Sequence, residues 1–452
     1  MRSCRPSVTI LAVALSAASL PAQGVGHEEF GARRLELMRR IADGITLLHS
    51  ESGEKPESQP SFMQNSTFYY FAGLPGLASA VLALDAPARE TVLFLPPVPS
   101  AFGYRVEDVV PEPGAGTAAD VGVTRALPWD SLTSFLRRRQ AAGVTSWYVD
   151  DARRSEALGV PDGMLPVNGS RTLWARSLAE SFPGATIRSA AQVIRDLRFV
   201  KSPAETAILR ENARMTAVAL RAGMRAIRPG VRQRAVEMRV ASACVDAGAT
   251  GPSFWPWTMS GPNAHVPMLV RSVYSYDQLD RTMRAGEVVR LDVGCTSRYY
   301  GADVGRTVPV NGRYSAGQRE TWDLLIAAYR AGMAHIRAGV TIAEVLASSR
   351  SEIQRLQPTM RTDLGRRAAE VLLAVNGMAE WSIHSVGIDS GETPLPTLAS
   401  GAVLAFEPIF SVGNDAFYLE DMILVTEGGS EVLSAGLPYT AAEIERTMRL
   451  SR

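Results

Sequence analysis

The pattern of hydrophobic and polar positions divides this chain into an N-terminal part of short apolar runs and a C-terminal part dominated by longer helical segments. In the first part, the apolar runs alternate with helical patterns at 31–43 and 129–142. The runs read as strands at 67–74, 79–85, 90–96 and 146–150. This alternation predicts an α/β domain with a mixed sheet over residues 28–195.

Helix-start signals organise the second part. A Ser or Thr followed three residues later by Glu or Gln, the capping-box pattern, occurs at Ser202, Ser315 and Thr341. The predicted helices are 203–228, 231–247 and 316–338, with a further helix after Thr341. Similar peptides join the helices of each pair, IRPGV at 227–231 and IRAGV at 336–340. The two helix pairs therefore look like copies of one unit.

Each helix pair is followed by a predicted β-hairpin that carries two acids. Asp292 and Asp303 lie in VRLDVGCTSRYYGADVGRT, where Cys295 to Tyr300 reads as a turn. Glu407 and Glu420 lie 115 and 117 positions further on, again within apolar strands. The joining peptides are 109 positions apart, so the repeat includes the acids. The pattern predicts an α+β domain over residues 200–452, built from two pseudo-symmetric helix-helix-hairpin halves.

Four carboxylates around one pseudo-twofold centre call for cations. Two isolated acids could be solvated residues at a sheet edge, but four buried like charges cannot coexist without positive charge. His384, in EWSIHSVGID, lies between the acid hairpins in a strand-like segment. Four carboxylates and one imidazole form an oxygen-rich ligand set for two divalent ions, Mn²⁺, Co²⁺ or Zn²⁺, with a water or hydroxide between them.

These motifs resemble the pita-bread metallopeptidases, and within them the Xaa-Pro aminopeptidases (aminopeptidase P) and prolidases. The C-terminal part carries LDVG, GADVGRT, HSVGID, FEPIF and LEDMILVTEGG in the order and spacing of that family. The likeness extends to the junction LRFVKSPAETAILR, to SGPNA at 260–264 and, more weakly, to NSTFYYFAG. It implies a creatinase-like N-terminal domain followed by the pita-bread domain.

The resemblance also implies a role for each ligand. Asp292 would bind one metal, His384 and Glu407 the other, and Asp303 and Glu420 would bridge the two ions. Glu407 would in addition act as general base. Manganese is the metal that we expect first, with cobalt or zinc as alternatives.

Several positions depart from the family pattern. Three further histidines and an arginine of the family are replaced by Met268, Glu380, Gly391 and Tyr418. His265 stands three residues before Met268 and is the candidate substrate-binding substitute for the first of them. Each lost oxyanion-stabilising donor costs roughly 2.7–4 kcal/mol of transition-state stabilisation, so slow chemistry is expected.

The N-terminal residues read as a targeting segment. Arg2 and Arg5 precede an apolar stretch at 8–20, which is too short to span a membrane, and small residues follow near position 22. A signal peptide over residues 1–23 would send the chain to the periplasm or outside the cell. Its removal takes away two arginines and no acids, so the net charge of +1 becomes −1. This near-neutral balance argues against a nucleic-acid partner.

Only three cysteines are present, and Cys4 would leave with the signal peptide. A bridge between Cys244 and Cys295 stays open, although the large core makes one unnecessary.

Two functions remain. The first is a dinuclear metalloaminopeptidase that hydrolyses the first bond of short peptides, of Xaa-Pro type, through a metal-bridging hydroxide. The second is a weak or inactive pita-bread protein that binds peptides or amines. The sequence leaves open whether the chain is a homodimer.

Overall fold

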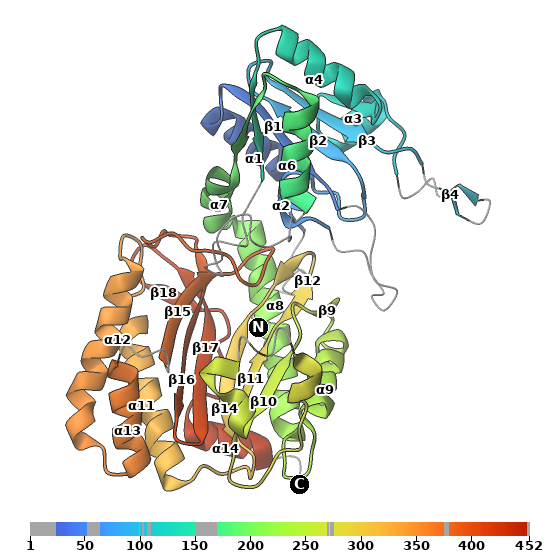
Figure 1. The fold of residues 1–452 in the computed structure, drawn as a ribbon. Coiled ribbons are helices and arrows are strands. Elements are labelled where there is room, and N and C mark those ends of the chain that lie inside the picture. Colours follow the sequence, from blue (N-terminus) through green and yellow to red (C-terminus); the bar gives the residue numbers. More distant parts are fainter. Residues whose placement is uncertain are drawn as a thin grey trace, which may run out of the picture.

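The computed structural model describes residues 24–449 with internal gaps at 52–63, 99, 102–103, 106–109, 151–169, 269–270, 272–274 and 375–378. The expected signal peptide lies outside these residues. The ribbon forms two domains, the N-terminal one above the C-terminal one in Figure 1, with α7 (Ala191–Phe199) and α8 (Pro203–Ala226) at the junction. In the described part of the chain, no helix combines the length and the apolar character needed to cross a bilayer.

The N-terminal domain is a mixed sheet with helices on both faces. Its strands are ordered β6-β3-β2-β1-β7-β8, and the pairs β1–β7, β7–β8 and β3–β6 are parallel. The strands are β1 (Gly44–His49), β2 (Val81–Asp85), β3 (Glu90–Leu95), β6 (Arg125–Pro128), β7 (Ser146–Val149) and β8 (Thr186–Ser189), with a separate pair β4 (Ser100–Ala101) and β5 (Tyr104–Arg105). The helices before α7 are α1 (His27–Arg40), α2 (Ser66–Ala72), α3 (Ala115–Val121), α4 (Ser131–Ala141) and α6 (Ser170–Ser181). Each face of the sheet is covered by its own cluster of buried apolar side chains.

The segment predicted as a strand at 67–74 is instead helix α2, so that prediction was wrong. The side chain of Asn65 accepts a hydrogen bond from the backbone N–H of Phe68 and caps the helix start, and Gly73 ends the helix in the left-handed conformation. Its side chains from Thr67 to Ala72 are buried on every side. Burial of all faces removes the helical period from the sequence, which is why the segment looked like a strand.

The C-terminal domain is built around a second sheet, ordered β10-β11-β14-β17-β16-β15, with β18 paired to β17. Its strands are β10 (Trp257–Ser260), β11 (Val288–Val293), β14 (Val304–Pro309), β15 (Ala379–Ser385), β16 (Val403–Val412), β17 (Asp415–Val425) and β18 (Ser430–Val432). A small side sheet contains β9 (Gly251–Pro252), β12 (Cys295–Ser297) and β13 (Tyr300–Gly301). The segment 295–300, expected to be a simple turn, is therefore a short two-stranded arm.

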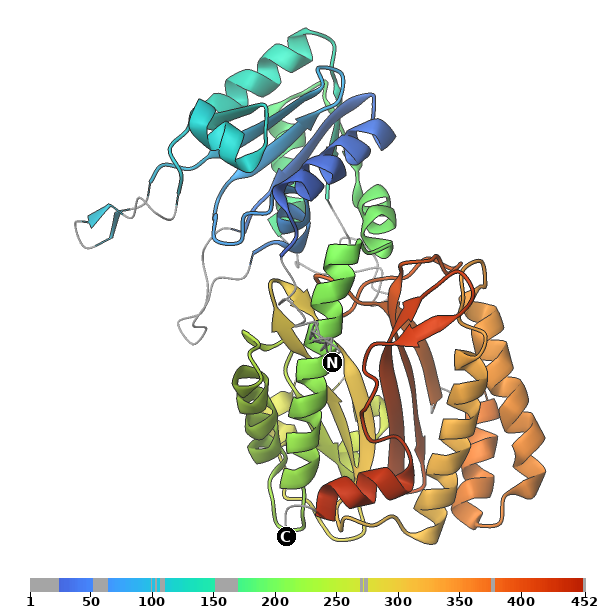
Figure 2. The ribbon, with the colours of Figure 1, turned by 180° about the vertical axis from the view of Figure 1, so that it is seen from behind.

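Two groups of helices cover this sheet. Helices α8 and α9 (Gln233–Asp246) pack on the first half, and α11 (Ala316–Met333), α12 (Ile342–Leu356) and α13 (Asp363–Leu373) lie along the second (Figures 1 and 2). The last helix, α14 (Ala441–Arg449), lies below the sheet and contacts α8 and α11. The 3-10 turns are η1 (Gly261–Ala264), η2 (Tyr276–Leu279) and η3 (Gln357–Thr359). This is the predicted arrangement of two helix-helix-hairpin halves around a curled sheet.

All three capping boxes form as predicted. The side chains of Ser202, Ser315 and Thr341 each accept from the backbone N–H three residues on, and the Glu or Gln at that position accepts from the cap residue's own N–H. Helix α11 ends at Met333, five residues before the predicted end.

Candidate metal centre

Neighbouring strands bring acids from both hairpins into one row. In the register, Asp292 of β11 lies opposite Gly305 of β14, and Gly305 lies opposite Glu420 of β17. Asp303 immediately precedes β14. Side chains of directly opposed residues point to the same face of a sheet, so Asp292 and Glu420 share one face across a glycine.

The second pair of strands adds His384 and Glu407. On β15 and β16, Ser382 lies opposite Glu407, and His384 lies two residues along β15 from Ser382. His384 Nε2 is 3.4 Å from Glu407 Oε1, 3.7 Å from Glu420 Oε1 and 3.8 Å from Asp303 Oδ2. Ligand atoms of Asp303, His384 and Glu420 all lie within 4.8 Å of one another. The structure therefore gathers the imidazole with acids from both hairpins.

The electrostatics are those of a crowded anionic cluster. Burial, followed by the charge of Glu420, raises the pKa of Asp292 to about 8, and the same two causes raise the pKa of Asp303 and of Glu407. Burial acts to lower the pKa of His384, but the nearby carboxylates of Glu420 and Glu407 raise it to about 9. Four carboxylates in one buried place are unfavourable without added positive charge.

The cluster fits divalent metal ions. Within the described residues, Asp303 Oδ1 and Glu420 Oε1 are buried oxygens with no hydrogen-bond donor. A buried carboxylate oxygen normally has a donor or a cation, because desolvation is otherwise uncompensated. Four carboxylates and one imidazole are also the donor types that hard and borderline divalent ions accept. The residues present therefore match the group that the family implies.

Two residues beside the cluster were not assigned a role from the sequence. The Tyr418 hydroxyl lies 3.0 Å from Glu407 Oε2 and 2.7 Å from Glu420 Oε2. Arg290, only 2% exposed, donates from Nη1 to Asp292 Oδ2 at 3.2 Å. The pattern Arg-x-Asp in a buried strand was a readable signal, since residues two apart share a face.

His265 does not lie in the acid row. It follows η1, and the backbone N–H of its neighbour Val266 donates to Ser411 Oγ near the end of β16. Burial raises the pKa of Asp415, the first residue of β17, and Gln318 and the nearby His265 act against that rise. Ser411 is four residues along the strand from Glu407, roughly 13 Å. A contact between His265 and substrate stays a prediction.

The other departures from the family pattern have clear structural places. Glu380 is exposed on β15, and Met268 packs beside a small apolar cluster near η1. Gly391 faces open space, since a Cβ added there would meet no atom within 4 Å. Its neighbour Glu392 is paired with Arg198 at 2.5 Å and with Lys201 at 3.3 Å.

Lys201 ties the domain junction to the strand that carries His384. Its Nζ donates to Ser385 Oγ at 2.7 Å, and Ser385 directly follows His384. Its side chain is 1% exposed in its ion pair with Glu392. The junction motif LRFVKSPAETAILR thus helps to fix the end of β15.

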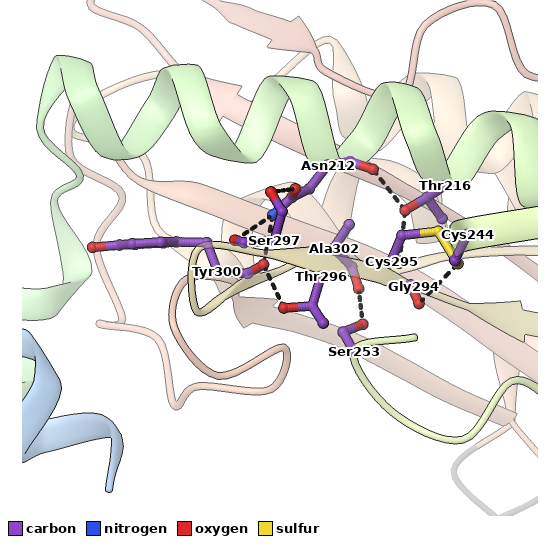
Figure 3. Close-up of a disulfide and its surroundings, with 10 residues drawn as sticks. All are labelled: Asn212, Thr216, Cys244, Ser253, Gly294, Cys295, Thr296, Ser297, Tyr300 and Ala302. Atoms are coloured by element: carbon purple, nitrogen blue, oxygen red, sulfur yellow. Dashed lines mark hydrogen bonds between the residues drawn. A yellow bond between two sulfur atoms is a disulfide. The ribbon is translucent and has the colours of Figure 1, made fainter. Parts of the chain in front are cut away.

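A disulfide joins Cys244 of α9 to Cys295 of β12, which settles the pairing that the sequence left open (Figure 3). Cys295 follows Asp292 by three residues. Its backbone N–H donates to Thr216 Oγ1 on α8, and Ser253 Oγ donates to the carbonyl of Ala302, next to Asp303. The chain between Asp292 and Asp303 is therefore fastened to two helices and a loop.

The arm also meets the N-terminal domain. The ring of Tyr299, at its tip, stacks on Tyr69 of α2 with centroids 4.4 Å apart. The Tyr299 hydroxyl donates to the carbonyl of Pro75 at 2.8 Å. Of the N-terminal histidines, His27 is exposed, whereas His49 is half-buried with its ring edge-on to Trp174.

The fold and this ligand cluster define a two-domain metallohydrolase with a pita-bread C-terminal domain. Comparison with known proteins gives the family. The model of metallopeptidase family M24 matches residues 207–427. The Xaa-Pro aminopeptidase of Escherichia coli strain K12 is 28% identical over 95% of this chain and 99% of that protein. Xaa-Pro aminopeptidase 3 of Mus musculus is 26% identical over 94% of this chain and 86% of its own length.

A solved structure agrees with the sequence matches. Zinc-substituted E. coli aminopeptidase P in complex with product has a TM-score of 0.74 at 24% identity, over 95% of this chain and 100% of that one. Residues 207–427 match metallopeptidase family M24, and the chain is a pita-bread metallopeptidase similar to the Xaa-Pro aminopeptidases.

Proposed function

We propose that this chain is a metal-dependent aminopeptidase that releases the N-terminal residue from short peptides, preferentially when proline follows. The observation that carries the proposal is the convergence of His384 with acids from both hairpins in one buried cluster. Relatives that span nearly the whole chain and are called Xaa-Pro aminopeptidases support the substrate class.

We assign the five residues to two metal sites as the family resemblance implies. Asp292 would hold one ion, His384 and Glu407 the other, and Asp303 and Glu420 both. When bound, such ions polarise a substrate carbonyl and lower the pKa of a coordinated water to near neutrality. The oxygen-rich ligand set favours Mn²⁺, with Co²⁺ and Zn²⁺ as the alternatives to be tested.

Glu407 is the residue that we assign to proton transfer. One of its oxygens faces His384 and the other lies beside the Tyr418 hydroxyl, so the carboxylate is held in one orientation. A thiol nucleophile is not available among the described residues, because Cys244 and Cys295 are bonded to each other.

Carboxylates at the cluster also account for cleavage at the first bond. The free α-amine of a peptide is a cation that can bind Asp292 or a neighbouring carboxylate. A substrate held by its amine in this way presents its first peptide bond to the site, which restricts cleavage to that bond. We expect His265 to contribute to substrate binding less than the acids do, because it lies near Ser411 and Asp415, away from the acid cluster.

The test is a panel of Xaa-Pro and Xaa-Ala di- and tripeptides, assayed after reconstitution with Mn²⁺, Co²⁺ or Zn²⁺. Release of single N-terminal residues, fastest for Xaa-Pro and abolished by chelator, is the expected result. No cleavage by a sample with full metal occupancy would favour the peptide-binding alternative.

We also propose that the chain works in an oxidising compartment, such as the periplasm or the extracellular space. The buried Cys244–Cys295 disulfide supports this, because disulfides are rare in reducing cytosol. Alkylation and mass analysis of protein from fractionated cells would decide it, since thiols that react without reductant would contradict the proposal.

A further inference from the structure

Arg290 and Tyr418 occupy matching places beside the acid row. Arg290 precedes Asp292 by two residues on β11, and Tyr418 precedes Glu420 by two on β17, so each shares a face with its acid. Both meet at Thr307 of β14. Arg290 lies opposite Thr307 in the register, and the Tyr418 backbone N–H donates to Thr307 Oγ1 at 2.8 Å.

The intervening strand leaves room for the tyrosine ring. A Cβ added at Gly305 would lie 1.9 Å from the Tyr418 ring, so the ring fills the space that a side chain on β14 would otherwise take. Tyr418 is 1% exposed. The ring is thus held in the space above Gly305 of β14, and its hydroxyl points to the acids.

The hydroxyl links two ligand carboxylates. It lies within hydrogen-bond distance of both Glu407 and Glu420, which come from different strands of the same hairpin. One phenolic proton serves both oxygens, so the two carboxylates are held to a common point. The hydroxyl is not needed for packing, because a phenylalanine ring would fill the same space above Gly305.

The guanidinium completes the arrangement from the other side. The Arg290 side chain donates to Asp292, and its guanidinium carbon lies 5.5 Å from the centre of the Tyr418 ring. A cation over an aromatic face is attracted to it, which couples the two side chains. Arg290 and Tyr418 lie side by side, and together they contact three of the four acids, Asp292, Glu407 and Glu420.

We propose that Arg290 and Tyr418 form a positioning pair that holds Asp292, Glu407 and Glu420 in their ligand geometry before metal binds. This inference rests on the metal site of the proposed function. Groups that orient metal ligands typically change metal affinity by about 10–100-fold when they are removed. The pair adds no ligand of its own and acts through the three acids.

The test is titration of chelator-treated protein with Mn²⁺ by calorimetry, comparing Tyr418→Phe, Arg290→Met, Arg290→Lys and the double variant Tyr418→Phe with Arg290→Met. Tyr418→Phe and Arg290→Met should each weaken Mn²⁺ binding about 10–100-fold. Arg290→Lys should recover part of the loss. The double variant should lose less than the product of the single losses, because the residues act together.

Tyr329→Phe is the matched control. Tyr329 is also fully buried in this domain and stacks on Phe406, and its hydroxyl has no hydrogen-bond partner among the described residues, so its removal should leave Mn²⁺ affinity unchanged. If Arg290→Met fails to fold by circular dichroism, Tyr418→Phe against Tyr329→Phe still decides. Parental affinity in Tyr418→Phe, or losses that simply multiply, would overturn the positioning pair. Failure of the unmodified protein to bind Mn²⁺ would instead overturn the proposed function.

Discussion

The two acid hairpins place their acids alike but are held by different means. In the first, β11 and β14 have six residues each, and the connection between them leaves the sheet as the β12–β13 arm. In the second, β16 and β17 have 10 and 11 residues and continue to a tight turn, where Gly413 adopts a positive φ of 60°. The first hairpin depends on contacts outside itself, whereas the strands of the second pair directly with each other on both sides of Glu407 and Pro408, up to the turn.

Those outside contacts come from several parts of the molecule. The arm is joined to α9 by the disulfide, to α8 through Asn212 and Thr216, and to the N-terminal domain through Tyr299. A regular hairpin fixes its register by its turn and its ladder. A hairpin whose connection leaves the sheet, as that of β11 and β14 does, needs contacts with other elements to hold its position. The same ligand geometry is therefore sensitive to different changes in the two halves. The first half depends on the contacts of the arm with its surroundings, and the second depends on the pairing of β16 with β17.

The largest expected effect separates the chemical roles of the halves. Glu407→Gln should lower kcat about 10²–10⁴-fold, because a general base is lost while the amide oxygen keeps the shape of the side chain. Asp292→Asn, the corresponding change in the first half, should mainly weaken binding of one ion and recover activity at high Mn²⁺. Steady-state kinetics across Mn²⁺ concentrations would test this, and indistinguishable variants at saturating metal would contradict it.

Removal of the disulfide tests the fastening of the first hairpin. Cys244→Ala with Cys295→Ala opens a loop of 51 positions and should cost about 2–4 kcal/mol of unfolding free energy. Chemical denaturation of the metal-free protein measures the loss, and the parent in reductant provides the control. A loss below about 1 kcal/mol would mean that hydrogen bonds to α8 suffice.

A gain of activity is expected from one departure from the family pattern. Gly391→His should raise kcat about tenfold, a fraction of the 10²–10³ that one oxyanion donor can supply. The side chain has room, because a Cβ there meets nothing within 4 Å. Gly428→His, at a similarly open position in the turn after β17, is the control. Equal rates for the two variants would show that a missing donor at 391 is not limiting.

The last expected effect is a dependence of stability on pH. The fold raises the pKa of Asp292 to about 8 and that of His384 to about 9, so it favours their protonated forms. Their contribution to stability is present at low pH and is lost as pH rises to about 9. Metal-free protein should therefore unfold at lower temperature at pH 9 than at pH 6. The increase in Tm on adding Mn²⁺ should be larger at pH 9, and equal increases would contradict this.

The elements that the sequence predicted well are those with local signals. The three capping boxes at Ser202, Ser315 and Thr341 start helices where expected, because a cap and its partner are only three residues apart. The repeated spacing of acids in apolar strands likewise identified residues that the fold gathers. Helix α2 was missed because complete burial hides its period.

What the sequence could not supply depends on contacts between distant strands. Tyr418 reaches Glu407 only because β17 pairs with β16, and the Tyr418 ring lies near Arg290 only because Gly305 of β14 has no side chain in the space that the ring fills. The location of His265 beside Asp415 follows from the packing of η1 against β17. The pairing of Cys244 with Cys295 likewise required α9 to lie against the arm.

Elemental analysis of purified, Mn²⁺-reconstituted protein is the most direct test of the metal centre. We expect about two ions per chain in the parent, about one in Asp292→Ala, and none in Asp303→Ala or Glu420→Ala, with each variant folded by circular dichroism. A folded parent without bound metal, or a Glu420→Ala variant that keeps both ions, would contradict it.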